Sequence, residues 1–113
     1  MNLILRIIIS AVVAFGLSYI LSGVRIDKFT TALLVAIVLG ILNAIIKPII
    51  VILTLPITIF TFGLFLFVIN AAIILLAAKF VPGFKVDGFW WALLFSFLLS
   101  LITSIFYRPS RDE

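Results

Sequence analysis

The sequence predicts an all-α integral membrane protein, in which four transmembrane helices form two hairpins that repeat each other. Three observations support this fold class. Of the 113 residues, 66% are hydrophobic and 11% are charged, whereas a soluble domain has about 25% charged residues. Clusters of charge separate apolar runs that are long enough to cross a bilayer. The segment 23–41 is also followed, sixty positions later, by the similar segment 83–101.

The missing residue types restrict the chemistry. The chain has no Cys, no His and four acidic residues. Disulfides and thiol chemistry are therefore excluded, and neither a metal site nor a catalytic nucleophile–base pair is expected. We expect a protein that is not an enzyme and has no cofactor. The net charge of +4 favours anionic lipid head groups as partners, rather than nucleic acid.

The apolar runs define the expected helices, because about 20 apolar residues cross the hydrocarbon core. The runs cover residues 7–24, 29–46, 49–78 and 89–107. The third run is too long for one crossing and contains Pro56, which interrupts a helix. We therefore expect the third crossing over residues 62–81. Residues 49–59 form a short apolar segment that we expect to lie in the membrane interface or to re-enter the bilayer.

The first run is expected to remain as an uncleaved span, since residues 1–23 hold one Arg and no A-x-A cleavage site. Four crossings place both termini on one side. Four basic residues fall on each side, so the loop charges do not decide the orientation. The charged tail and the amino group of Met1 favour termini in the cytoplasm.

The repeat extends beyond apolar identities. Gly23 matches Gly83 and Asp27 matches Asp87. We interpret the chain as a single transmembrane domain with a duplicated hairpin. The parts are repeat 1, about 1–48; a connecting segment, 49–61; repeat 2, about 62–109; and a polar tail, 110–113. Because each repeat crosses the membrane an even number of times, both run in the same direction, and their pseudo-twofold axis lies along the membrane normal.

The two linkers, GVRID and GFKVD, alternate apolar and charged residues as β-strands do. A twofold axis places them antiparallel, so we predict a small β-ribbon; two hydrated loops are the alternative. Within each linker a basic residue precedes Asp by two positions. This spacing predicts the ion pairs Arg25–Asp27 and Lys85–Asp87, each worth ~0–1 kcal/mol at a wet surface. A proton or ion site at Asp27 and Asp87 is the alternative.

Polar and small residues inside the apolar runs are the candidate functional positions: Ser10, Gly40, Asn43, Asn70, Ser100 and Thr103. In lipid such residues usually bring helices together or bond across them, so we expect them to mediate helix packing. A pore or ligand contact is the alternative. Lys47, Trp90 and Trp91 are expected at the membrane interface, where Lys47-Pro48 ends the second helix and the aromatic rings lie at head-group depth.

Two stretches resemble a known family. LNAIIKPIIVILTLPITIFTFGLFLFVINA and VPGFKVDGFWWALLFS are similar to the phage holin family 4 superfamily, or YvlD-like small bacterial membrane proteins. The resemblance covers almost the whole chain. It implies an inner-membrane protein with about four helices, and the holin label implies oligomeric membrane lesions that release a lytic enzyme. The resemblance supplies no catalytic residues.

We therefore expect a small non-enzymatic membrane protein that forms homo-oligomers and acts in membrane permeabilisation or envelope stress. The alternative is a homo-oligomeric transporter or lipid-handling protein, in which Asn43, Asn70 and Lys47 contact an anionic head group. The sequence indicates no particular small-molecule substrate. A leucine at position 70 separates the two hypotheses, because helix packing would fail in the first case and transport alone in the second.

Overall fold

The computed structural model describes residues 2–107, so the predicted polar tail, 110–113, lies outside the described residues. The described chain is almost entirely helical. In order, its elements are α1 (Leu3–Ile20), β1 (Val24–Ile26), α2 (Phe29–Ile41), the π-helical segment η1 (Leu42–Ile46), α3 (Lys47–Leu53), α4 (Leu55–Phe60), α5 (Phe65–Phe80), β2 (Phe84–Val86) and α6 (Phe89–Tyr107).

Three helices in residues 2–107 are long and apolar enough to cross a membrane: Leu3–Ile20, Phe29–Leu53 and Phe89–Phe106. The predicted third crossing is shorter than expected, because α5 begins at Phe65 and has 16 residues. Phe62 and Gly63, with φ of 57° and 88°, form a left-handed turn before it. That backbone conformation cannot belong to a right-handed helix.

The second helix does not end at Lys47-Pro48, so this prediction was wrong. The chain stays helical from Phe29 to Leu53. Within η1 the helix widens, and the Lys47 N–H donates to the Leu42 carbonyl five residues earlier. Pro48 then lies in the first turn of α3, where its missing N–H is tolerated. Residues 49–53 consequently extend the second helix instead of starting a separate interfacial segment.

The interruption expected at Pro56 occurs two residues earlier, at Thr54. The backbone of Thr54 has φ −102° and ψ 12°, outside the ideal helical values. Its hydroxyl donates to the Ile50 carbonyl at 2.8 Å. Pro56 lies in the first turn of α4. Residues 49–61 therefore divide between the end of one helix and a second short helix, joined by a bend.

The predicted β-ribbon is confirmed. β1 and β2 pair antiparallel, with Arg25 opposite Lys85. The Asp27 N–H donates to the Gly83 carbonyl at 3.2 Å, and the Asp87 N–H donates to the Gly23 carbonyl at 2.8 Å. The two bonds are equivalent under the repeat, because Asp27 corresponds to Asp87 and Gly83 corresponds to Gly23. The ribbon joins the two hairpins at one end of the molecule.

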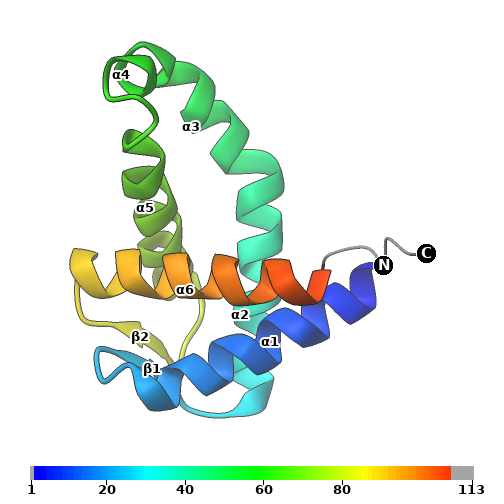
Figure 1. The fold of residues 1–113 in the computed structure, drawn as a ribbon. Helices are drawn as coiled ribbons and strands as arrows, with labels where there is room; N and C mark the ends of the chain where they lie inside the picture. Colours follow the sequence, from blue (N-terminus) through cyan, green and yellow to red (C-terminus); the bar gives the residue numbers. More distant parts are fainter. Residues whose placement is uncertain (1, 108–113) are drawn as a thin grey trace.

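The helices pack most closely near the ribbon and separate at the opposite end. Figure 1 shows α1 and α6 side by side and antiparallel, with α2 and α5 crossing them at a large angle. The buried residues of α1 lie from Ala11 to Leu17, and those of α2 begin near the ribbon. The largest fully buried side chains are Phe84, Phe95, Val24, Val35 and Val81. The core therefore lies beneath the ribbon, and the far helix ends are exposed.

Candidate functional site

An open crevice of about 430 Å³ lies between α1, α6 and the helix formed by α2 and η1. Its volume falls in the range of small-ligand sites, which is about 300–1,000 Å³. Five of the six polar or small positions singled out from the sequence line it: Ser10, Gly40, Asn43, Ser100 and Thr103. The sixth, Asn70, does not line it. Residues selected by the sequence pattern thus come together at one crevice from three separate helices, although helix packing was the role expected of them.

Small side chains create the crevice. Ala14 on α1 and Ala36 on α2 contribute to its lining, together with Gly40. A Cβ added at Gly40 would have no neighbouring atom within 4 Å. The space at this position is thus open, and Gly40 does not bring two backbones into contact here. Within residues 2–107 of one chain, Gly40 therefore does not perform the packing role predicted for it.

The polar side chains of the crevice differ in their hydrogen bonding. The Thr103 hydroxyl donates to the Leu99 carbonyl at 2.6 Å, within its own helix. Asn43 lies in the π-helical segment and is exposed. Within residues 2–107 the side chains of Asn43 and Asn70 form no hydrogen bond. The bonding between helices expected of these two amides is therefore not made inside the described part of one chain.

Arg6 is a site residue that the sequence reasoning missed. It lines the crevice from the second turn of α1, and among the lining residues it alone carries a charge. Arg6, Ser10 and Ala14 are spaced four residues apart, so they lie on one face of the helix. The available signal was a lone cation one turn before the polar Ser10 in an apolar run. The part of the crevice lining that the structure describes therefore carries one positive charge.

The residues expected at the membrane interface lie outside the crevice. Lys47 is half-buried at the start of α3 and is not part of the lining. Trp90 is exposed, and its ring meets Phe89 edge to face at a centroid distance of 5.5 Å. Trp91 instead lies against the linker. A Cβ added at Gly23 would lie 2.1 Å from its indole Cδ2, so the ring packs directly on the glycine backbone.

The ion pair of the ribbon is formed between the linkers, so the predicted pairs Arg25–Asp27 and Lys85–Asp87 were both wrong. Two nitrogens of Arg25 donate to the Asp87 carboxylate at 2.9 and 3.2 Å. Asp27 instead accepts a hydrogen bond from the Thr31 hydroxyl. The antiparallel register brings Arg25 beside Asp87, which is distant in sequence.

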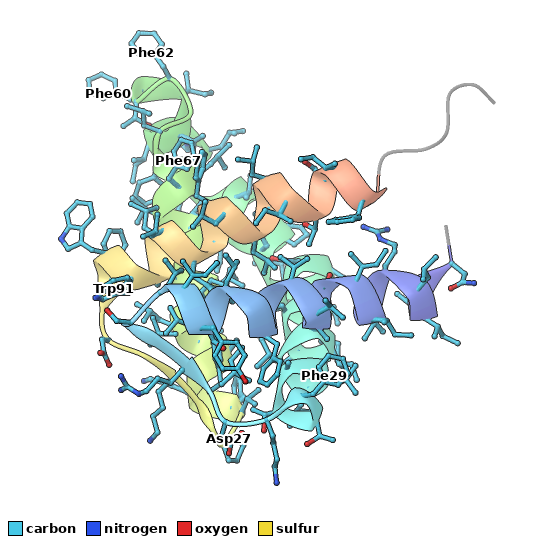
Figure 2. All side chains as sticks on the ribbon, turned by 60° about the horizontal axis from the view of Figure 1, so that its bottom comes forward. Asp27, Phe29, Phe60, Phe62, Phe67 and Trp91 are labelled. Atoms are coloured by element: carbon cyan, nitrogen blue, oxygen red, sulfur yellow. The ribbon has the colours of Figure 1, made fainter. Side chains whose placement is uncertain are left out.

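Asp27 and Asp87 have different hydrogen-bond partners because their surroundings differ. The carboxylate of Asp27 lies against Gly83, 2.6 Å from where a Cβ would be. At the matching Gly23, the ring of Trp91 occupies that side. Asp87 therefore has no corresponding place and turns to Arg25. Figure 2 shows Asp27 and Trp91 at different ends of the ribbon region.

Replacing Arg25 with Gln is expected to change stability by less than about 1 kcal/mol, because exposed ion pairs contribute little. The side chains of Arg25 and Asp87 are 57% and 47% exposed. The measurement is the SDS fraction that unfolds half of the protein in mixed micelles. A large shift of that midpoint would show that the pair holds the ribbon together.

Comparisons with known proteins agree with the membrane character of the fold. No solved structure matches the chain. The chain is 36% identical over 96 residues to the membrane protein YvlD of Bacillus subtilis (strain 168), covering 84% of this chain and 81% of that protein. It is 42% identical over 81 residues to the protein SCO3922 of Streptomyces coelicolor, covering 68% of this chain and 65% of that protein.

A family model covers nearly the whole described structure. Residues 1–105 match the model described as "Mycobacterial 4 TMS phage holin, superfamily IV". Neither this family nor the two relatives indicates an enzymatic activity. The resemblance seen in the sequence is thereby confirmed, and the chain is a membrane protein that belongs to the superfamily IV phage holin family.

Proposed function

We propose that this is a non-enzymatic protein of the bacterial inner membrane that crosses the bilayer four times and self-associates. The observation that carries the proposal is the arm formed by residues 47–64, which includes α3, α4 and the turn before α5. Thr58 is the arm's one buried residue, and its hydroxyl has no hydrogen-bond partner within residues 2–107. Figure 1 shows the arm extending away from the crossing point of the helices.

The arm carries the most exposed aromatic side chains of the described chain. Phe60 is 86% exposed and Phe62 is 96% exposed, and Figure 2 shows both at the extremity of the molecule. The backbone beside them is irregular, with the bend at Thr54 and the left-handed Phe62. Irregular backbone is tolerated at membrane depth only when protein or water covers it. A second copy of the chain would cover both the rings and the turns.

The helix α5 spans about 24 Å at 1.5 Å per residue, which is less than the hydrocarbon core of about 30 Å. As a fourth crossing it would need local thinning of the bilayer or oligomerisation. The duplicated hairpin is supported by one feature of the linkers. The linker hydrogen bonds recur at positions sixty residues apart. We propose that both termini face the cytoplasm, with the ribbon on the other side.

Self-association can be tested with single cysteines, because the natural chain contains none. Phe62→Cys is expected to form a disulfide-linked dimer when isolated membranes are oxidised, since the arm would lie beside its copy. The control is Tyr19→Cys, a residue 78% exposed on α1 near the ribbon. The readout is the dimer fraction on a non-reducing gel. Equal cross-linking at both positions would indicate random collision and overturn the proposal.

We further propose that the assembled protein permeabilises the inner membrane. Induced cells are expected to take up a membrane-impermeant dye. The double variant Phe60→Ala, Phe62→Ala should abolish uptake at matched expression, because it removes the rings through which copies would meet. Tight membranes at high expression would overturn permeabilisation and favour a role in envelope stress. The cross-linking result decides self-association independently.

A further inference from the structure

We propose that the crevice binds the phosphate group of an anionic membrane lipid, with an acyl chain of that lipid lying along the apolar part of its wall. The inference concerns one chain and holds whether or not copies associate. It rests on the donors that line the crevice, on the distribution of its apolar residues and on its place in the fold.

The donors match a phosphate. Arg6 carries five N–H donors in a planar fork that pairs with phosphate oxygens, and Asn43 carries two more on its amide nitrogen. Ser100 adds a hydroxyl from the opposite wall. Among residues 2–107 no acidic residue lines the crevice, since Asp27 and Asp87 lie in the linkers. Within this part of the chain an anion therefore meets donors from three elements and no carboxylate.

The rest of the lining is hydrocarbon. Val35, Leu39 and Leu99 border the crevice beside the small residues Ala14 and Ala36. A free phosphate would leave these side chains without a matching surface, because apolar walls do not solvate an ion. An amphiphile satisfies both parts, with its charged group among the donors and its chain against the wall.

The place of the crevice suits a head group. Arg6 is near the start of α1, at the end far from the ribbon, where the helices separate. A basic side chain near the end of a spanning helix lies at the level of lipid phosphates. Asn43 reaches the crevice from the π-helical segment, and such segments occur frequently at functional sites. Because Pro48 has no N–H, the turn before it also loses one helical hydrogen bond.

The test is native mass spectrometry of the full-length chain in detergent, titrated with phosphatidylglycerol, with diacylglycerol of the same acyl chains, and with inorganic phosphate. Phosphatidylglycerol is expected to give a resolved one-to-one complex, and the other two probes none. Arg6→Gln should weaken that complex about tenfold, because a hydrogen bond to a charged group is lost. Asn43→Leu should weaken it as well. Circular dichroism establishes that each variant is folded.

Arg25→Gln is the matched control, since it removes the same charge from an exposed arginine outside the crevice. It should leave binding unchanged. An equal loss in the Arg6 and Arg25 variants would reduce the effect to net charge and overturn the site. Equal binding of diacylglycerol would show an apolar groove without phosphate recognition. Binding of inorganic phosphate alone would assign the donors to a free ion and overturn the lipid as its source.

Discussion

Replacing Gly23 with alanine is expected to destabilise the fold by about 3 kcal/mol, the upper part of the range for overpacking. A Cβ there would lie 2.1, 2.2 and 2.3 Å from three ring atoms of Trp91. These atoms belong to a rigid indole, so they cannot move aside as the end of a flexible side chain does. The φ of Gly23 is not positive, and the expected cost is therefore steric alone.

The measurement is the SDS midpoint of unfolding in mixed micelles, followed by circular dichroism. Gly16→Ala is the control, because a Cβ at that helical position meets nothing within 4 Å. It should stabilise the protein by about 0.5–1 kcal/mol, since alanine favours the helix. Adding Trp91→Ala to Gly23→Ala should restore part of the lost stability. An unchanged midpoint in Gly23→Ala would show that the indole does not occupy this place.

Replacing Phe95 with alanine is expected to cost about 3 kcal/mol, the lower end of the range for buried phenylalanines. Phe95 is fully buried, and its ring lies 5.8 Å from that of Phe84 on the ribbon. In a bilayer the unfolded segments remain in hydrocarbon, so transfer of the side chain out of water contributes less to the destabilisation. The cavity and the lost packing contacts still contribute to it. Phe95→Ala should therefore also loosen the ribbon.

Phe106→Ala on the same helix is the comparison, because Phe106 is 56% exposed. It should leave the unfolding midpoint almost unchanged, since lipid replaces the contacts of the ring. Hydrogen exchange at the amides of β2 provides a second readout. Faster exchange in Phe95→Ala is expected there because Phe84 loses its partner. Equal effects of the two substitutions would contradict the position of the core beneath the ribbon.

The ribbon could be predicted from the sequence because its signal is local, whereas the crevice was not predicted and only its polar residues were singled out. GVRID and GFKVD alternate with period two, and each begins with a glycine at which the chain leaves a helix. Polar residues inside apolar runs avoid lipid, so Ser10, Asn43 and Ser100 were recognisable as candidates. Which of them share one crevice depends on how three helices cross, and no local pattern specifies that crossing.

The predictions that were wrong concern backbone geometry and pairings that the residue pattern does not specify. Lys47-Pro48 was expected to end a helix, but a π-helical turn before Pro48 keeps the helix continuous. Arg25 was paired with the nearest carboxylate in sequence, whereas the strand register brings it to Asp87. Ser10 lines the crevice while Asn70, sixty positions later, does not. The sequence similarity of the two halves therefore overstates how alike their surroundings are.

The N-terminal end of α1 lies far from the ribbon that joins the hairpins. The chain also connects the far ends of α2 and α5 through α3 and α4, but no such connection precedes α1 within residues 2–107. The 18 residues of α1 reach about 27 Å from the ribbon, so a rotation of about 5° moves their tip by roughly 2 Å. Residues of α1 from Leu3 to Ala14 line the crevice. A tilt of α1 about the ribbon would therefore change the width of the crevice most near Arg6 and least near the ribbon.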